Sequence, residues 1–140
     1  MKKMNNKGFS LVELIIVIAI MAILAAALAP QLIKYLEESR ISTDNSACDT
    51  IKSCFNAAIT NEKAYKEVTG KTVASGVTLS TKDDISCASS ELGKELASSL
   101  ADLVAPKESG KNKYKITWDV TTDATSGQVS VTNIKVETIA

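Results

Sequence analysis

Residues 9–33 read FSLVELIIVIAIMAILAAALAPQLI, a stretch in which Glu13 is the only charged side chain. As an α-helix these 25 residues extend about 37 Å, whereas the hydrocarbon core of a bilayer is about 30 Å thick. The stretch is therefore long enough to cross a membrane with some tilt. It is also longer than the apolar region of an ordinary signal peptide.

The residues before this stretch are basic. Residues 1–8 contain Lys2, Lys3 and Lys7 and no acidic side chain. A basic segment next to an apolar helix stays on the cytoplasmic side of the membrane. We therefore expect the chain after the helix to face outward.

Glu13 is the fifth residue of the apolar stretch and lies between Val12 and Leu14. An acid inside a membrane segment costs about 2.5–3.5 kcal/mol on insertion scales, so it marks a candidate functional residue. The alternative is that Glu13 lies near the lipid headgroups and extends toward water. The residues around it favour a functional role.

Those residues resemble the start of a type IV pilin precursor with a short leader. The basic leader ends in Gly8, Phe9 follows as the first mature residue, and Glu13 is the fifth residue after the cut. Pro30 lies where this family usually has a proline. The resemblance covers about the first 40 residues, and beyond them it concerns only the architecture.

The resemblance implies a processing and assembly route. A membrane-embedded prepilin peptidase would cut between Gly8 and Phe9 and methylate the new amine of Phe9. In this family the residue equivalent to Glu13 is thought to meet the Phe9 equivalent of a neighbouring subunit, which sets the axial register. The subunits would form a homo-polymer, assembled by a membrane platform protein and a cytoplasmic ATPase that act on them indirectly.

Pro30 predicts a kink in the apolar helix. Proline has no N–H, so the hydrogen bond to the carbonyl of Ala26 is lost. In filaments of the family, the stretch before this proline can become extended. Here Ala22 stands where many members have glycine, and alanine favours helix. We therefore predict a kink and not local melting.

The rest of the chain predicts a head domain behind a second, amphipathic half of the helix. The helix is expected to continue over residues 34–69 and to stop at Gly70, with Lys66 in its last turn. Charged side chains of this half, Asp44 among them, are expected to fall largely off its apolar stripe. The stripe recurs at spacings of three, four and seven and consists of Ile41, Cys48, Ile51, Phe55, Ala58 and Ile59.

A connector over residues 70–110 is expected to contain a short strand at Val77–Leu79 and a helix at about Ser90–Val104. Residues 111–140 read as antiparallel strands, because Tyr114, Ile116, Trp118 and Val120 alternate with polar side chains. Thr121 to Gly127 would form the turn. Beyond it the alternation changes phase near Thr132–Asn133, which indicates a bulge or a break.

These elements predict an α+β, pilin-like fold. Its long N-terminal helix would have a protruding apolar half and a second half packed on a small antiparallel sheet. The expected organisation is a cleaved leader at residues 1–8, a transmembrane and filament-core segment at 9–33, and a globular head at 34–140.

The three cysteines leave several pairings open. Cys48 and Cys54 are six residues apart, which on a helix means about 120° of rotation and about 9 Å of rise, too far for a disulfide. Cys87 could pair with either. We favour Cys54–Cys87 slightly, with Cys48 a buried thiol, and three reduced cysteines are an equal alternative.

Composition excludes several kinds of chemistry. The chain has 140 residues, 16 basic and 16 acidic side chains, and no histidine, so His-based triads and His metal sites are ruled out. Zero net charge argues against binding nucleic acid through a positive field, and removal of the leader lysines leaves the chain at −3. We expect no enzyme, no cofactor and no metal, although Asp119 and Asp123 could hold calcium weakly. A solvated turn explains those two acids better.

The sequence therefore predicts a structural subunit of a type IV pilus that serves adhesion, motility or biofilm formation. Before assembly it would be a single-pass membrane protein with its head outside, and afterwards part of an extracellular filament. The alternative within the superfamily is a pseudopilin of a type II secretion or competence system. Two other classes stay open, namely a secreted protein with a cleaved signal peptide and an anchored domain that does not polymerise.

Overall fold

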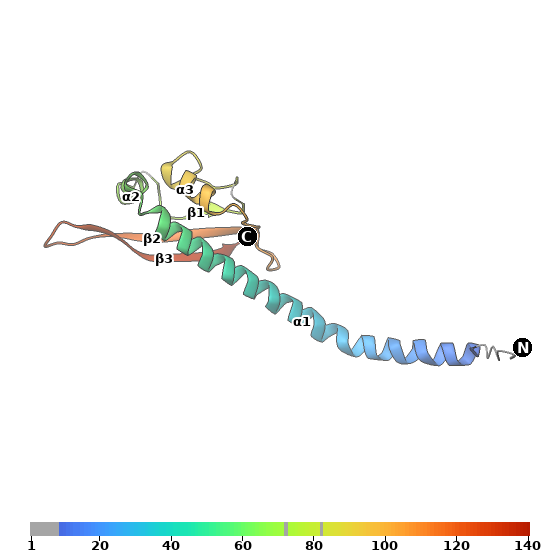
Figure 1. The fold of residues 1–140 in the computed structure, drawn as a ribbon. Helices are drawn as coiled ribbons and strands as arrows, with labels where there is room; N and C mark the ends of the chain where they lie inside the picture. The colour runs from blue at the N-terminus through green and yellow to red at the C-terminus, as the bar shows by residue number, and fades with distance from the viewer. Residues whose placement is uncertain (1–8, 72, 82) are drawn as a thin grey trace, which may run out of the picture. The chain divides into compact units, whose positions relative to one another are not determined.

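The computed structural model of this chain describes residues 9–71, 73–81 and 83–140. It contains three helices and one three-stranded antiparallel sheet within those residues (Figure 1). The long apolar N-terminal helix, the small sheet and the shorter helices confirm the predicted α+β, pilin-like class. In chain order the elements are α1 (Leu11–Ala58), α2 (Glu62–Thr69), β1 (Val77–Leu79), α3 (Glu91–Ser99), β2 (Lys113–Thr122) and β3 (Val129–Ile139).

The chain divides into two compact units, one up to Glu38 and one from Ser39 to Ala140. The first unit holds the apolar part of α1. Its side chains are exposed at every described position except Glu37, which is half-buried. This unit has no core of its own in the isolated chain, so its apolar surface must be covered by something else.

The second unit has a core to which α1, α2, β1, α3 and β2 all contribute. Phe55 of α1 packs on Trp118 of β2, with ring centroids 4.9 Å apart and planes at 33°. Each large apolar side chain buried in this way contributes about 1.5–3 kcal/mol. Other core members are Ile51, Ala58, Ala64, Val68, Val77, Leu79, Leu92, Leu96, Tyr114 and Ile116.

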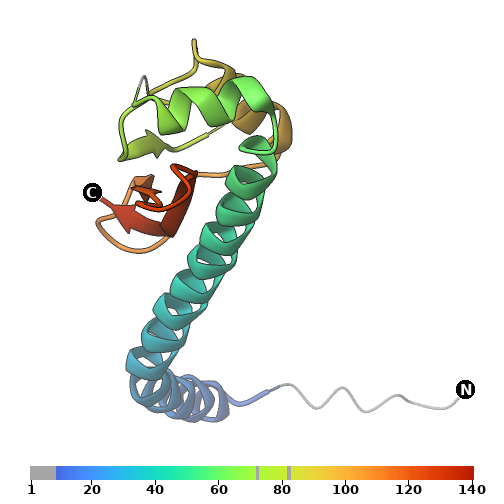
Figure 2. The ribbon, with the colours of Figure 1, turned by 90° about the vertical axis from the view of Figure 1, so that its left-hand side faces the viewer.

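Figures 1 and 2 show how this unit is arranged. The sheet lies beside the second half of α1, and α2 and α3 lie side by side beyond the end of that helix. The strand order is β1-β2-β3, with both neighbouring pairs antiparallel. The short strand β1 at Val77–Leu79 and the hairpin of β2 and β3 are where the sequence predicted strands.

The prediction of one helix running to residue 69 is wrong, because α1 ends at Ala58. The chain turns over residues 59–61, and the side chain of Asn61 then accepts a hydrogen bond from the Lys63 amide and caps α2. A short polar side chain at this position offers the backbone an alternative to continued helix. The predicted stop is confirmed, because the Gly70 amide donates to the Lys66 carbonyl at the end of α2.

Helix α3 begins as predicted but ends earlier than the predicted Val104. The Ser90 side chain accepts from the Gly93 amide and caps the helix, whereas the last helical residue is Ser99. The helix ends because the following segment runs back to α1, where its amides bind Asp44. Leu100 is still buried beside the core.

Glu67 of α2 provides a second cap for α3. Its carboxylate accepts the amides of Glu91 at 3.1 Å and Leu92 at 3.0 Å. Both amides belong to the first turn, where no partner exists within the helix. Gly93 in the same turn lies so close to the preceding loop that a Cβ would stand 2.0 Å from the Cys87 carbonyl oxygen. This contact and the Glu67 cap fix α3 against α2 and the connector.

The predicted irregularity of the last strand is confirmed as a bulge. Thr117 pairs with Lys135 and Asp119 with Thr132, so the register shifts between these pairs. Asn133 adopts a left-handed conformation with φ of 51°, which asparagine tolerates better than most residues. The bulge lets Val131 before it and Ile134 and Val136 after it all pack against the core.

Candidate processing and assembly site

Phe9 and Ser10 precede α1, and Phe9 is 85% exposed. Helix α1 begins at Leu11, which places Ser10 at the cap position and Glu13 in the first turn. The Ser10 amide donates a hydrogen bond of 2.9 Å to Oε2 of Glu13. This is one half of a capping box, in which a Glu three residues after the cap satisfies the cap's own amide.

The sequence interpretation missed this role of Ser10. The pattern Ser-x-x-Glu before an apolar run, here residues 10–13, is the signal that could have indicated it. The bond gives the Ser10 amide a partner at the start of the helix, where none exists within the backbone. Because a carboxylate has about four acceptor positions, Glu13 keeps capacity for a partner from another molecule.

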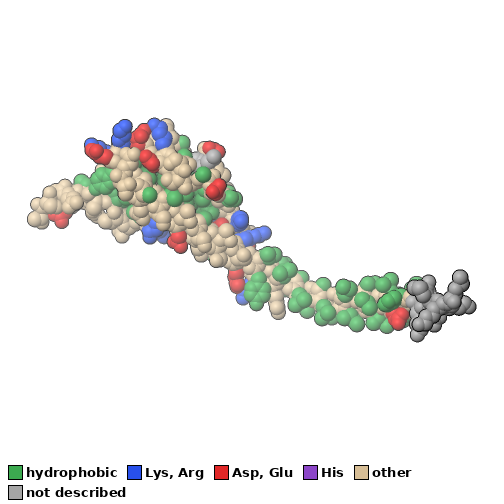
Figure 3. All heavy atoms as spheres, viewed as in Figure 1, with side chains coloured by type: hydrophobic (Ala, Val, Ile, Leu, Met, Phe, Trp, Pro, Cys, Tyr) green, Lys and Arg blue, Asp and Glu red, His purple; other side chains and the backbone are tan. Residues whose placement is uncertain are grey.

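The apolar surface behind Glu13 surrounds the helix on all sides. Figure 3 shows hydrophobic side chains along the visible face of this part of α1, with charged side chains concentrated elsewhere. An 18-residue window of α1 has a mean hydropathy of 3.0. By length and composition, α1 is the one helix of the described residues that could cross a membrane.

Pro30 lies within α1, and the helix continues through it. Because proline lacks an N–H, the carbonyl of Ala26 has no donor four residues further on. The predicted kink at Pro30 stays a prediction. The predicted cleavage falls between Gly8 and Phe9, and Gly8 lies outside the described residues.

The chain matches the family described as the prokaryotic N-terminal methylation motif over residues 3–29. This motif is the signature of type IV prepilins, and it supports a type IV pilin or pseudopilin. Members of that class are structural subunits, processed by a prepilin peptidase and polymerised with other pilins. The motif and the apolar helix fit a protein that is anchored in a membrane and later extracellular. No solved structure matches the chain.

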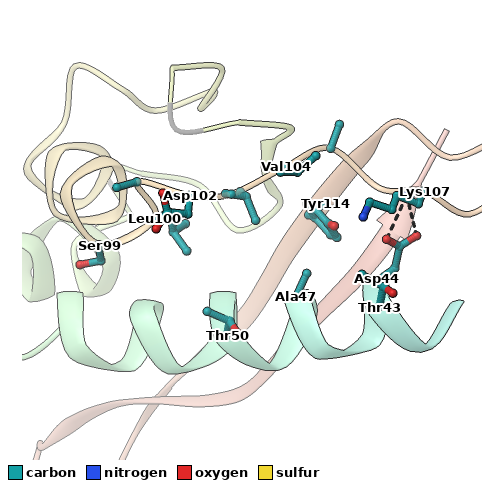
Figure 4. Close-up of a pocket in the computed structure, with 13 residues that line it drawn as sticks. Thr43, Asp44, Ala47, Thr50, Ser99, Leu100, Asp102, Val104, Lys107 and Tyr114 are labelled. Atoms are coloured by element: carbon teal, nitrogen blue, oxygen red, sulfur yellow. Dashed lines mark hydrogen bonds between the residues drawn. The ribbon is translucent and has the colours of Figure 1, made fainter. Parts of the chain in front are cut away.

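Asp44 forms a second polar site, in the head. It is 3% exposed, and its two carboxylate oxygens accept the Lys107 amide at 2.9 and 2.8 Å and the Glu108 amide at 2.7 Å (Figure 4). The prediction that Asp44 falls off the buried stripe is wrong. Its spacing could have placed Asp44 on the buried stripe, because it is three residues after Ile41 and four before Cys48.

Tyr114 lies close to Asp44 and is 1% exposed. Burial, then the negative charge of Asp44 and the neighbouring Cys48 thiol, raise the pKa of Tyr114 to about 12. The phenol therefore keeps its proton at any physiological pH. Tyr114 lines a groove of about 390 Å³ between α1 and residues 99–107 (Figure 4).

All three cysteines are free thiols in the structure and partly buried. Burial raises the pKa of each thiol, and the charges of Asp44 and Asp49 raise that of Cys48 further. The Cys54 sulfur lies 3.8 Å from the Ser99 carbonyl oxygen. The pairing of Cys54 with Cys87 stays a prediction.

The acids of the β2–β3 hairpin serve the turn. Oδ1 of Asp123 accepts the amides of Thr125 and Ser126 at 2.8 and 2.7 Å, and these bonds lower the pKa of Asp123. Oδ2 of Asp119 accepts from the Asn133 side chain at 2.9 Å. Among the described residues no group of three or more metal-ligating side chains is present. Asp123 is therefore used by the turn, as predicted, whereas Asp119 binds Asn133 at the bulge.

Proposed function

We propose that this chain is a structural subunit of a type IV pilus, cut between Gly8 and Phe9, methylated on Phe9 and polymerised into a surface filament. The observation that carries the proposal is the placement of Glu13. It lies in the first turn of an exposed apolar helix, four residues after Phe9 and inside the matched methylation motif. Adhesion, motility or biofilm formation would be the tasks of such a filament.

The exposed surface of the first unit supports polymerisation. An apolar helix of this length is stable in a bilayer before assembly, and in a filament it must be covered by other copies. Removal of the three leader lysines would lower the cost of leaving the membrane, because basic residues hold a helix end at the cytoplasmic face. A platform protein and an ATPase would drive this extraction.

Glu13 would then act as the register-setting residue between subunits. Burying its carboxylate in a bundle of apolar helices is costly unless it is paired. The Ser10 amide is its partner within one chain, and the methylated amine of Phe9 in the next subunit would supply the compensating positive charge. A subunit shifted along the axis would leave both charges buried and unpaired.

The variants Glu13→Gln and Glu13→Ala test this role. Gln keeps an oxygen that can accept from the Ser10 amide but carries no charge, whereas Ala removes both functions. We expect both to abolish surface filaments, measured by shearing cells and imaging the released material, with an unchanged head in circular dichroism. Glu62→Ala is the matched control, because it removes an exposed acid from the first turn of α2. Normal filaments from either Glu13 variant would refute the charge pair.

The pseudopilin alternative rests on the same motif, since the match ends at residue 29 and includes none of the head. The two functions differ in the cell. Deletion of the gene would remove surface filaments if the chain is a pilin. It would instead block secretion of exported enzymes or uptake of DNA if the chain is a pseudopilin.

A further inference from the structure

The groove beside Tyr114 is lined mostly by apolar atoms, and Asp102 and Lys107 also contribute to its walls. Small side chains of α1, namely Thr43, Ala47 and Thr50, form the floor. The opposite wall comes from the segment after α3, which includes Leu103 and Val104 (Figure 4). Val104 is 62% exposed, which is unusual for a valine in this head. Small residues on a helix allow another backbone to come close.

The Tyr114 hydroxyl is a hydrogen-bonding group that β2 contributes to this groove. The Tyr114 side chain as a whole is 1% exposed, but its hydroxyl is not a buried atom without a partner, because Thr132 Oγ1 is the one such side-chain atom of the described residues. The nearby Asp44 carboxylate already accepts three hydrogen bonds from backbone amides. A phenol hydroxyl can donate one hydrogen bond to an acceptor that enters the groove. The groove is therefore suited to an uncharged, apolar occupant that brings one hydrogen-bond acceptor.

The chain itself carries such an acceptor. Pro30 leaves the carbonyl of Ala26 without its helical donor, in a part of α1 that has no charged side chain. Ala22, Ala25 and Ala29 lie within one turn of Ala26 along the helix and have small side chains. When proline frees a carbonyl in a membrane helix, groups on neighbouring helices commonly bind it.

We propose that the groove of one subunit receives the Ala22–Pro30 stretch of a second copy of this chain. In this contact the Tyr114 hydroxyl donates to the Ala26 carbonyl of the neighbour. The inference rests on the proposed function, since it describes a contact in the polymer. The apolar helix is also the surface that most needs cover, because beyond residue 36 the exposed large hydrophobic side chains of the described residues are only Ile41 and Val104.

Photo-crosslinking in assembled filaments tests the contact. A benzophenone amino acid is placed at position 104, at the exposed rim of the groove, and at position 124 in the exposed hairpin as the control. We expect position 104 to give crosslinked dimers whose peptides map to residues 22–30 of the second copy, and position 124 to give none there. Filaments in which position 104 crosslinks elsewhere, or not at all, would overturn the inference and leave the proposed function standing. Cells that make the chain but no filament would instead count against the proposed function.

A double-mutant cycle tests the hydrogen bond. Tyr114→Phe removes the hydroxyl, and Pro30→Ala restores an N–H for the Ala26 carbonyl within its own helix. We expect Tyr114→Phe to lower the temperature at which filaments dissociate in the wild-type background and to have no effect in the Pro30→Ala background. Tyr35→Phe, which removes an exposed hydroxyl, is the control. Equal effects of Tyr114→Phe in both backgrounds, or no effect in the wild type, would contradict the proposed bond.

Discussion

Asp44 is the one buried charged side chain among the described residues. Two backbone amides, those of Lys107 and Glu108, donate hydrogen bonds to its oxygens. Hydrogen bonds to a charged group contribute about 1.5–3 kcal/mol each, and they offset the loss of hydration. Asp44 therefore fixes the segment between α3 and β2 to the second half of α1.

Replacing Asp44 tests this role directly. We expect Asp44→Ala to lower the free energy of unfolding of the head by about 2–4 kcal/mol, because two amides lose their acceptor in a buried place. Chemical denaturation of the full chain in detergent, followed by Trp118 fluorescence, measures the change. Asp49→Ala, an exposed acid five residues along the same helix, should change stability little. Equal stability of the two variants would show that the amide contacts are unimportant.

Tyr114 gives the head a pH dependence in alkali. Tyrosine in the unfolded chain loses its proton near pH 10, whereas burial and Asp44 raise the pKa of Tyr114 in the fold to about 12. The unfolded state therefore binds fewer protons in this interval, and the free energy of unfolding falls as pH rises from 10 to 12. We expect Tyr114→Phe to flatten this part of the stability curve. A curve that is unchanged by the substitution would contradict the assignment.

At this scale the sequence indicated some functional residues and not others. Glu13 stands out because it is an acid in an apolar run, and that mismatch, together with Phe9, is the basis of its proposed role in assembly. The sequence predicts Asp44 off the apolar stripe, whereas its partners are backbone amides 63 and 64 residues away. Such partners leave no mark in the sequence, whereas the spacing of Asp44 from Ile41 and Cys48 was a usable signal.

Among the secondary-structure elements, the strands and the caps were predicted best. The bulge near Asn133 follows from a change of phase in the alternating pattern, and Ser90 and Gly70 act as the predicted cap and stop. The ends of α1 and α3 were not predicted. Each depends on a long-range contact or on a single polar side chain, such as Asn61, that competes weakly with continued helix.

Gly93 shows how closely α3 approaches the connector. A Cβ there would meet the backbone at Cys87 and Ala88, with its nearest atom at 2.0 Å. We expect Gly93→Ala to destabilise the head by roughly 2–4 kcal/mol, although alanine favours helix by about 1 kcal/mol over glycine. Thermal unfolding of the full chain in detergent measures the loss, with the exposed Ser98→Ala in the same helix as the control. A stabilised Gly93→Ala variant would mean that the loop at Cys87 moves aside.

The whole molecule joins two units with opposite surfaces. The unit from Ser39 onward buries its apolar side chains around Phe55 and Trp118, whereas the unit up to Glu38 exposes them. A head with its own core can stay folded while its apolar helix is transferred from lipid to a bundle of like helices. Composition predicted this contrast, since residues 14–33 contain no charged side chain, whereas charged side chains are frequent after them.

The N-terminal sequence and intact mass of the protein in sheared surface material from its native cells test the central claim most directly. Our account predicts a chain that begins at Phe9 and carries one additional methyl group on its amine. A chain that begins at Met1, or near Leu28 after cleavage as a signal peptide, would contradict prepilin processing. Either of those results would leave an anchored or secreted domain in place of a pilus subunit.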